Sequence, residues 1–232
     1  NTSSRFFTVS MSLLRYSSAC IIPTLASLAE FRRRSLTSSA VECDSTLFSP
    51  SNVYAASYPA NQPIEDRSIR SSTNKLTMAG VLDGHGGWQV AEYVSKRIED
   101  ELLLHLEGTD FEDEWLVEEK IQLGFSNIEQ SYLEKVKDSF GLGYGEVAKV
   151  GCCVLVAFRS ASRLALANAG DCRAILASQV TDSDQTLALR ITNDHNCREP
   201  LEDLKLRREH PGEDDVVRCK SPHACYVKGR LQ

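Results

Sequence analysis

The five residues Asp83-Gly84-His85-Gly86-Gly87 combine a carboxylate, an imidazole and three glycines in one short stretch. A carboxylate offers the hard oxygen ligands that Mg²⁺ and Mn²⁺ prefer, and histidine exchanges protons near neutral pH. Glycines let the backbone turn sharply and come close to a ligand. The stretch therefore predicts a metal or anion site, and the alternative is a tight loop with a solvated Asp83 and His85.

Other carboxylates lie elsewhere along the chain. Glu65 and Asp66 are adjacent in a proline-rich segment, and Asp171 follows a glycine at an expected turn. Such groups are commonly solvated surface or turn residues, so they gain a chemical role only if the fold brings them to Asp83. The pair Asp194-His195 is assigned a structural role, because polar pairs at strand ends commonly hydrogen-bond a turn.

The elements that would position these residues follow from hydrophobic periodicity. Residues 76–82 are expected to form a buried strand that ends at Asp83, and residues 88–105 an amphipathic helix. A second helix is expected over about residues 111–137. From residue 148, short apolar segments separated by turns predict an antiparallel meander, and a helix follows over about residues 199–209.

Composition places the chain among ordinary globular proteins, with 42% hydrophobic and 25% charged residues. The net charge of −6 provides no basic field to attract nucleic acid. No run of about 18 apolar residues is present, so no membrane span is predicted. The eight cysteines lack paired C-x-x-C spacing, and we expect reduced thiols in preference to a disulfide scaffold. A zinc site is set aside because its candidates lack two closely spaced pairs: Cys197, His210, Cys219, His223 and Cys225.

The first 45 residues differ in composition from the rest. Residues 1–29 contain no acidic residue but many Ser and Thr, and three consecutive arginines follow at residues 32–34. Acid-poor N-termini rich in Arg and Ser resemble mitochondrial transit peptides, and a disordered tail without an address is the alternative. We therefore expect residues 1–45 to be an extension outside the fold and residues 46–232 to form the domain.

Four motifs, in this order, resemble the metal-dependent serine/threonine protein phosphatases of the protein phosphatase 2C family. They are Ile64-Glu65-Asp66, Val81-Leu82-Asp83-Gly84-His85-Gly86-Gly87, Ala167-Asn168-Ala169-Gly170-Asp171-Cys172-Arg173-Ala174 and Asp194-His195. The resemblance covers about residues 59–232. It implies an α+β fold, an α-β-β-α sandwich of two antiparallel sheets flanked by helices, with a binuclear Mg²⁺ or Mn²⁺ site at one end.

The resemblance also implies roles for individual residues. Asp83 would bridge the two ions, and Glu65 and the backbone carbonyl of Gly84 would complete the coordination of one of them. His85 would protonate the departing Ser or Thr oxygen. Asp66 would orient the attacking water from outside the coordination sphere. The implied function is hydrolysis of phosphoserine and phosphothreonine in proteins by a metal-activated water.

Two positions connect the chain to particular relatives. Asp171 matches a residue that helps to hold a weaker third ion in some relatives. Asn61 stands where most relatives carry an arginine that grips substrate phosphate. Residues 61–67 and 204–211 resemble the pyruvate dehydrogenase phosphatase branch. That likeness implies a phosphoprotein substrate in a mitochondrial dehydrogenase complex and a location in the mitochondrial matrix, with a cytoplasmic location as the alternative.

The end of the sequence departs from the family pattern. Two further aspartate ligands of the family lie beyond an arginine-rich strand that residues 227–232 resemble. We therefore expect a phosphatase domain that is incomplete at its C-terminus, and the activity of these 232 residues alone is left open. The second hypothesis is a catalytically inactive phosphatase-like module that binds a phosphoprotein. The intact set Glu65, Asp83 and His85 favours the enzyme.

Overall fold

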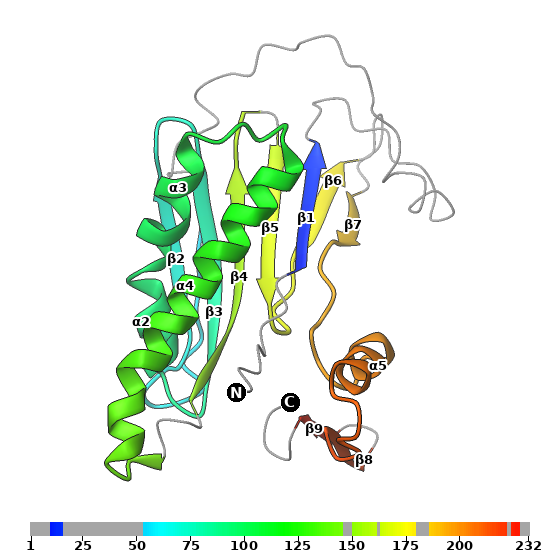
Figure 1. Cartoon of the computed structure of the whole chain (residues 1–232). Coiled ribbons are helices and arrows are strands. Elements are labelled where there is room, and N and C mark those ends of the chain that lie inside the picture. The colour runs from blue at the N-terminus through cyan, green and yellow to red at the C-terminus, as the bar shows by residue number, and fades with distance from the viewer. Residues whose placement is uncertain are drawn as a thin grey trace.

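The computed structural model describes residues 10–15, 53–145, 150–161, 163–179, 186–221 and 224–227. Its main feature is an antiparallel sheet of five strands in the order β1-β5-β4-β3-β2. The strands are β1 (Ser10–Arg15), β2 (Arg67–Ser72), β3 (Thr77–His85), β4 (Gly151–Arg159) and β5 (Arg163–Ala169). Helices α2 (Gln89–Ser95) and α4 (Glu114–Gly141) cover one face of this sheet (Figure 1).

The C-terminal part of the described chain forms smaller units. Strands β6 (Ile175–Gln179) and β7 (Thr186–Arg190) form a two-stranded sheet, and helix α5 (Pro200–Glu209) follows. Strands β8 (Val217–Ser221) and β9 (Ala224–Val227) form a hairpin. The predicted α+β class, with helices and antiparallel sheets, is confirmed.

Two expectations from the sequence need correction here. The single meander is wrong, because β6 pairs with β7 but not with β5. Gly170 follows β5 with a positive φ of 114°, and the backbone there leaves the sheet. The expectation of reduced thiols is also wrong at one pair: Cys219 and Cys225 are joined by a disulfide. The antiparallel register of β8 and β9 places these two cysteines opposite each other.

The N-terminal region also differs from the expectation. Residues 1–45 were expected to lie outside the fold, but Ser10–Arg15 pairs along β5 from Asn168 to Arg163 as edge strand β1. Without β1, strand β5 would be the edge of the sheet and would expose unpaired backbone N–H and C=O groups. Strand β1 pairs with these groups.

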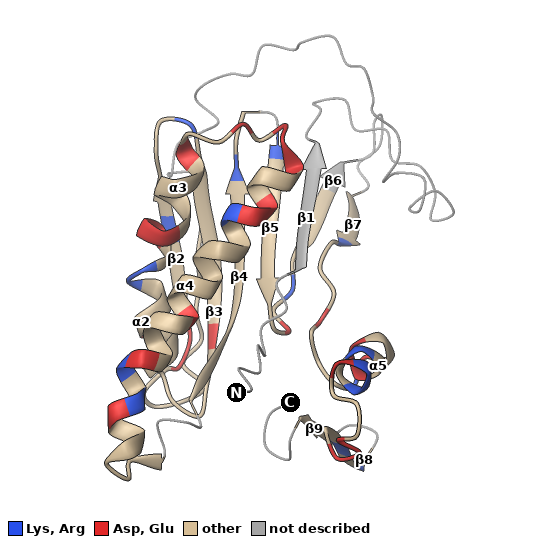
Figure 2. Cartoon of the chain, viewed as in Figure 1, with Lys and Arg blue, Asp and Glu red and all other residues tan. Residues whose placement is uncertain are grey.

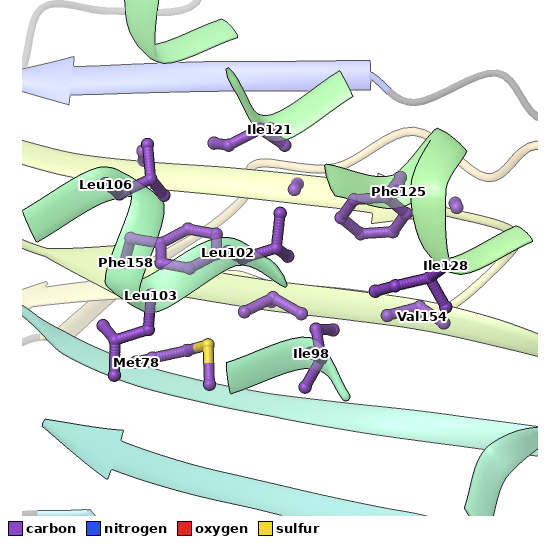
Figure 3. Close-up of a cluster of buried hydrophobic side chains, with 14 of the residues drawn as sticks. Met78, Ile98, Leu102, Leu103, Leu106, Ile121, Phe125, Ile128, Val154 and Phe158 are labelled. Carbon is purple, nitrogen blue, oxygen red and sulfur yellow. The ribbon is translucent and has the colours of Figure 1, made fainter. Parts of the chain in front are cut away.

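The core lies between the sheet and its helices (Figure 3). The expected helix over residues 88–105 is present, but it is divided into α2, a π-helical turn η4 (Glu99–Leu103) and α3 (Leu104–Glu107). Leu102 of η4 and Phe158 of β4 are completely buried. Gly124 of α4 permits the close approach of η4, since a Cβ atom there would come within 2.2 Å of Leu102 Cδ2.

Charged residues of both signs are interspersed along α4 and α5 (Figure 2), as expected for solvated helix faces. Asp113 precedes α4 as its N-cap, and its side chain accepts a hydrogen bond from the Leu116 N–H at 3.1 Å. Among the described residues, no helix is both long enough and apolar enough to cross a membrane.

Candidate active site

The candidate site lies at the end of β3, where the strand leads through a turn into α2. Successive strand residues point to opposite faces. Leu82 is therefore buried under the helices, while Asp83 and His85 are exposed on the other face. Gly86 and Gly87 follow with φ values of 70° and 144°, conformations that favour glycine. The sharp turn predicted from the glycines is confirmed.

The neighbouring strand β4 accommodates the His85 ring. His85 pairs with Gly151 in the sheet register, and a Cβ atom at Gly151 would come within 2.2 Å of His85 Nε2. The imidazole therefore occupies the space that a side chain at position 151 would fill. It remains exposed to solvent.

The segment that carries Glu65 and Asp66 lies beside Asp83 and Gly84. Strand β2 begins with Arg67 opposite Leu82, so the two preceding residues reach the level of the candidate site. A Cβ atom at Gly84 would come within 2.4 Å of the Glu65 carbonyl oxygen. Gly84 therefore has to be a glycine for this close approach, and the sequence alone placed these segments together only through the resemblance.

Four carboxylates interact at this end of the sheet. The pKa of Asp83 is raised from its ordinary value, first by partial burial of its carboxyl group in a residue that is otherwise exposed, and then by the negative charges of Asp66, Asp171 and Glu65, while His85 has the opposite effect. A nearby negative charge raises the pKa of a carboxyl group because it disfavours ionisation of that group. A bound cation would relieve this repulsion.

Asp171 is both a turn residue and a member of this group. It follows Gly170, whose conformation brings the backbone against Cys153: a Cβ atom at Gly170 would come within 2.4 Å of Cys153 Sγ. Burial raises the pKa of Cys153 to about 11, so its neutral thiol can donate to Asp171 Oδ1 at 3.5 Å. Asn196 Nδ2 donates to Asp171 Oδ2 at 3.2 Å. Sequence reasoning missed Asn196 because the contact spans 25 residues.

The remaining candidates have different surroundings. Asn61 Nδ2 donates to Glu65 Oε2 at 3.3 Å, so it lies next to the carboxylate group. Asp194 is buried and forms ion pairs with Arg173 and Arg190. This arrangement agrees with the structural role assigned to Asp194.

The donor set can be compared with what a metal requires. Within the described part of the chain, no three or more His, Cys, Asp or Glu side chains are grouped as a ready ligand set. The Asp83 and Glu65 carboxylates and the Gly84 carbonyl, which belong to segments that lie against each other, are all hard oxygen donors. They fit a cation such as Mg²⁺ or Mn²⁺, which uses one or two carboxylates and keeps several waters.

Comparison with known proteins identifies the family. The family model described as Protein phosphatase 2C matches residues 55–220. The chain is 35% identical over 179 residues to Probable protein phosphatase 2C 68 of Arabidopsis thaliana, covering 75% of this chain and 43% of that protein. It is 33% identical over 158 residues to Probable protein phosphatase 2C 78 of Oryza sativa subsp. japonica, covering 68% of this chain and 39% of that protein. The chain thus spans about two fifths of the length of these relatives.

A solved structure shares the fold. The chain resembles "Structure of a C.elegans sex determining protein" with a TM-score of 0.53 and 17% sequence identity, over 72% of this chain and 39% of that one. At this identity the likeness concerns the fold alone. The match to the family model covers more than half of the chain, and the motifs around Asp83 and Asp171 lie inside it. The chain belongs to the protein phosphatase 2C family.

Proposed function

We propose that this protein is a metal-dependent phosphatase that hydrolyses phosphoserine and phosphothreonine in proteins. One observation carries the proposal: the Glu65 carbonyl oxygen lies so close to Gly84 that a Cβ atom there would come within 2.4 Å of it, which brings the Glu65 segment beside Asp83 at the end of β3. Phosphate-monoester hydrolysis is among the slowest uncatalysed reactions. An enzyme for it therefore needs charge neutralisation and a proton donor, and exposed His85 provides the donor two residues after Asp83.

The carboxylates and the Gly84 carbonyl would hold the metal. When bound, Mg²⁺ or Mn²⁺ would supply Lewis acidity to the phosphoryl oxygens and to the attacking water. Asp83 would contact two ions, and Glu65 and the Gly84 carbonyl would contact one of them. Asp171 would contribute to a weaker third ion, with its carboxylate oriented by Asn196 at 3.2 Å.

Three other residues would act on water, leaving group and phosphate. Asp66 would accept a hydrogen bond from the attacking water and orient it. His85 would protonate the departing Ser or Thr oxygen, a step typically worth about 10²–10⁴-fold in rate. Asn61 would meet the substrate phosphate with its amide, which in the free protein donates to Glu65.

The proposal is tested by release of phosphate from a phosphoserine peptide in Mn²⁺. The protein, the variant Asp83→Asn and the control Asp110→Asn, at an exposed position near the start of α4, would be compared. We expect hydrolysis by the protein and the control and loss of hydrolysis in Asp83→Asn. Equal rates for all three would contradict the role of Asp83. Peptide binding without hydrolysis by any of them would favour the inactive binding module instead.

We also propose the finer family branch and location expected from the sequence. Asn61 in place of the usual arginine supports the pyruvate dehydrogenase phosphatase branch, and the acid-poor composition of residues 1–29 supports a mitochondrial address. Faster dephosphorylation of phosphorylated pyruvate dehydrogenase than of phosphocasein would agree with that branch. Residues 1–45 fused to a fluorescent protein test the address, and cytoplasmic fluorescence would contradict it.

The sandwich architecture is likewise a proposal. It is supported by apolar side chains on the sheet face opposite α2 and α4, where strand alternation places Val81, Leu155 and Leu166. Val81 is 48% exposed there. A second sheet over this face would bury it.

A further inference from the structure

Arg67, at the start of β2, contacts both segments that border the candidate site. Its Nη1 donates to the backbone carbonyls of Ile64 at 3.0 Å and Asp66 at 2.7 Å. Its Nε donates to Glu92 Oε2 of α2 at 2.6 Å, across 25 residues of sequence. Its guanidinium also lies 5.8 Å from the centre of the Trp88 ring, within the range of a cation–π contact.

The acceptor Glu92 is itself fixed. Lys96 Nζ lies 2.7 Å from Glu92 Oε1, while Arg67 takes the other oxygen. The hydrogen bonds from Lys96 and Arg67 lower the pKa of Glu92. The Arg67 and Glu92 side chains are only 24% and 29% exposed. A planar guanidinium with several donors at fixed angles suits a contact of this kind, whereas an ammonium group does not.

These contacts fix three consecutive carbonyl groups. Arg67 binds those of Ile64 and Asp66, and the carbonyl of Glu65 between them lies against Gly84. On the other side, Trp88 and Glu92 belong to the stretch that directly follows the His85 turn. Arg67 therefore connects the segment of Glu65 and Asp66 with the helix that leaves the Asp83 turn.

We propose that Arg67 is a positioning residue, which holds Glu65 and Asp66 against Asp83 so that the site binds a divalent cation with its carboxylates already in place. The inference rests on the proposed function, because it concerns the same site. Partners that orient metal ligands typically change metal affinity by about 10–100-fold when they are mutated. Arg67 acts in this way through the backbone of the ligand segment.

The sign of the effect separates positioning from plain electrostatics. Arg67 is a cation near a group of carboxylates, so removing its charge would by Coulomb's law strengthen the binding of another cation. Loss of positioning has the opposite effect, because Glu65 and Asp66 are then no longer ordered before the metal binds. A weaker affinity in Arg67→Met is therefore explained by positioning and not by charge.

The experiment is a calorimetric titration of the 232-residue chain with Mn²⁺ alone. The variants are Arg67→Met, Glu92→Gln, the double variant and Asp83→Asn. Arg70→Met is the matched control, since Arg70 lies three residues further along β2 and donates to the Val53 carbonyl, away from the site. Amide hydrogen exchange of residues 64–66 is measured on the same samples.

We expect Arg67→Met to weaken Mn²⁺ binding by about 10-fold and to speed exchange at residues 64–66. Glu92→Gln should weaken Mn²⁺ binding less than Arg67→Met does. The double variant should bind Mn²⁺ about as weakly as Arg67→Met alone, because the two residues act through one contact. Arg70→Met should bind as the unchanged chain does. Since Glu92→Gln leaves Arg67 and its carbonyl contacts in place, it keeps the test meaningful if Arg67→Met fails to fold.

Two results would overturn the inference, and they differ in what they say about the function. In the first, Asp83→Asn abolishes Mn²⁺ binding but Arg67→Met binds Mn²⁺ as tightly as the unchanged chain or more tightly. The positioning role of Arg67 is then wrong, while the proposed metal site at Asp83 is supported. If the unchanged chain and Asp83→Asn bind Mn²⁺ equally, or neither binds it, the metal site itself is wrong and the role of Arg67 falls with it.

Discussion

Gly84 of β3 lies against the backbone of Glu65, so closely that a Cβ atom at Gly84 would come within 2.4 Å of the Glu65 carbonyl oxygen. This contact joins the two segments that carry the candidate metal ligands. It is a backbone contact, which cannot relax by rotating a side chain. Position 84 therefore controls the distance between Glu65 and Asp83.

Gly84→Ala is expected to push the Glu65 segment away from β3. Overpacking of this kind typically costs about 1–3 kcal/mol of stability, and we expect Mn²⁺ affinity to fall as well. Urea unfolding and calorimetry measure the two effects. Gly141→Ala is the control, since a Cβ atom there meets nothing within 4 Å at the end of α4. An unchanged stability and affinity in Gly84→Ala would show that the two segments are not held in this contact.

His85→Gln is expected to reduce hydrolysis of a phosphoserine peptide by about 10²–10⁴-fold. The serine alkoxide is a poor leaving group that needs a proton, whereas p-nitrophenolate leaves without one. The same variant should therefore lose much less activity toward p-nitrophenyl phosphate. His105→Gln, at an exposed position on α3, serves as the control. Equal losses on both substrates would contradict the role of His85 as a proton donor.

Asp194→Asn is expected to lower the free energy of unfolding at neutral pH by about 1–3 kcal/mol, because buried Asp194 binds Arg173 and Arg190. These arginines hold the pKa of Asp194 below its ordinary value of 3.8. A carboxyl group with a lowered folded-state pKa contributes stability above the unfolded pKa, and this contribution is lost as the pH falls through the folded one.

The difference between the native protein and Asp194→Asn should therefore be constant above about pH 5 and shrink as the pH falls below 3.8. Urea unfolding across this range measures it. Asp138→Asn, at an exposed site on α4, should differ from the native protein by less than about 0.5 kcal/mol. A difference for Asp194→Asn that persists unchanged into strong acid would show that its ionisation does not stabilise the fold.

Arg163 offers a test of charge burial. Its side chain is 1% exposed and contacts Glu112 and Glu114, which are 49% and 60% exposed. The double variant Glu112→Gln/Glu114→Gln should lose about 3–5 kcal/mol of the free energy of unfolding, because it leaves the buried Arg163 cation without a charged partner. Arg163→Met should cost less, since the Glu112 and Glu114 side chains are already about half exposed and stay in contact with water. Urea unfolding of both variants checks the order, and the reverse order would contradict this account.

Several parts of the fold and site could be predicted from the sequence because they are local. The apolar run before Asp83 and the glycines after it determine a strand and a sharp turn. The second expected helix, over residues 111–137, is α4. Asp83, His85 and Glu65 could be named because the motifs match a family, and membership of that family is confirmed. Their roles stay predictions.

The parts that could not be predicted depend on contacts between distant residues. The pairing of Arg67 with Glu92 spans 25 residues of sequence, so no local pattern indicates it. The disulfide between Cys219 and Cys225 depends on the register of a hairpin. The pairing of β1 with β5 joins residues 10–15 to residues 163–168, which are far apart in the sequence.

The measurement that tests the central claim most directly is anomalous diffraction at the manganese edge from crystals of the protein grown with Mn²⁺. We expect a peak in contact with the Asp83 carboxylate and beside the Gly84 carbonyl, and no such peak in crystals of Asp83→Asn. A peak elsewhere, or no peak at saturating Mn²⁺, would contradict the claim that the end of β3 is a metal site.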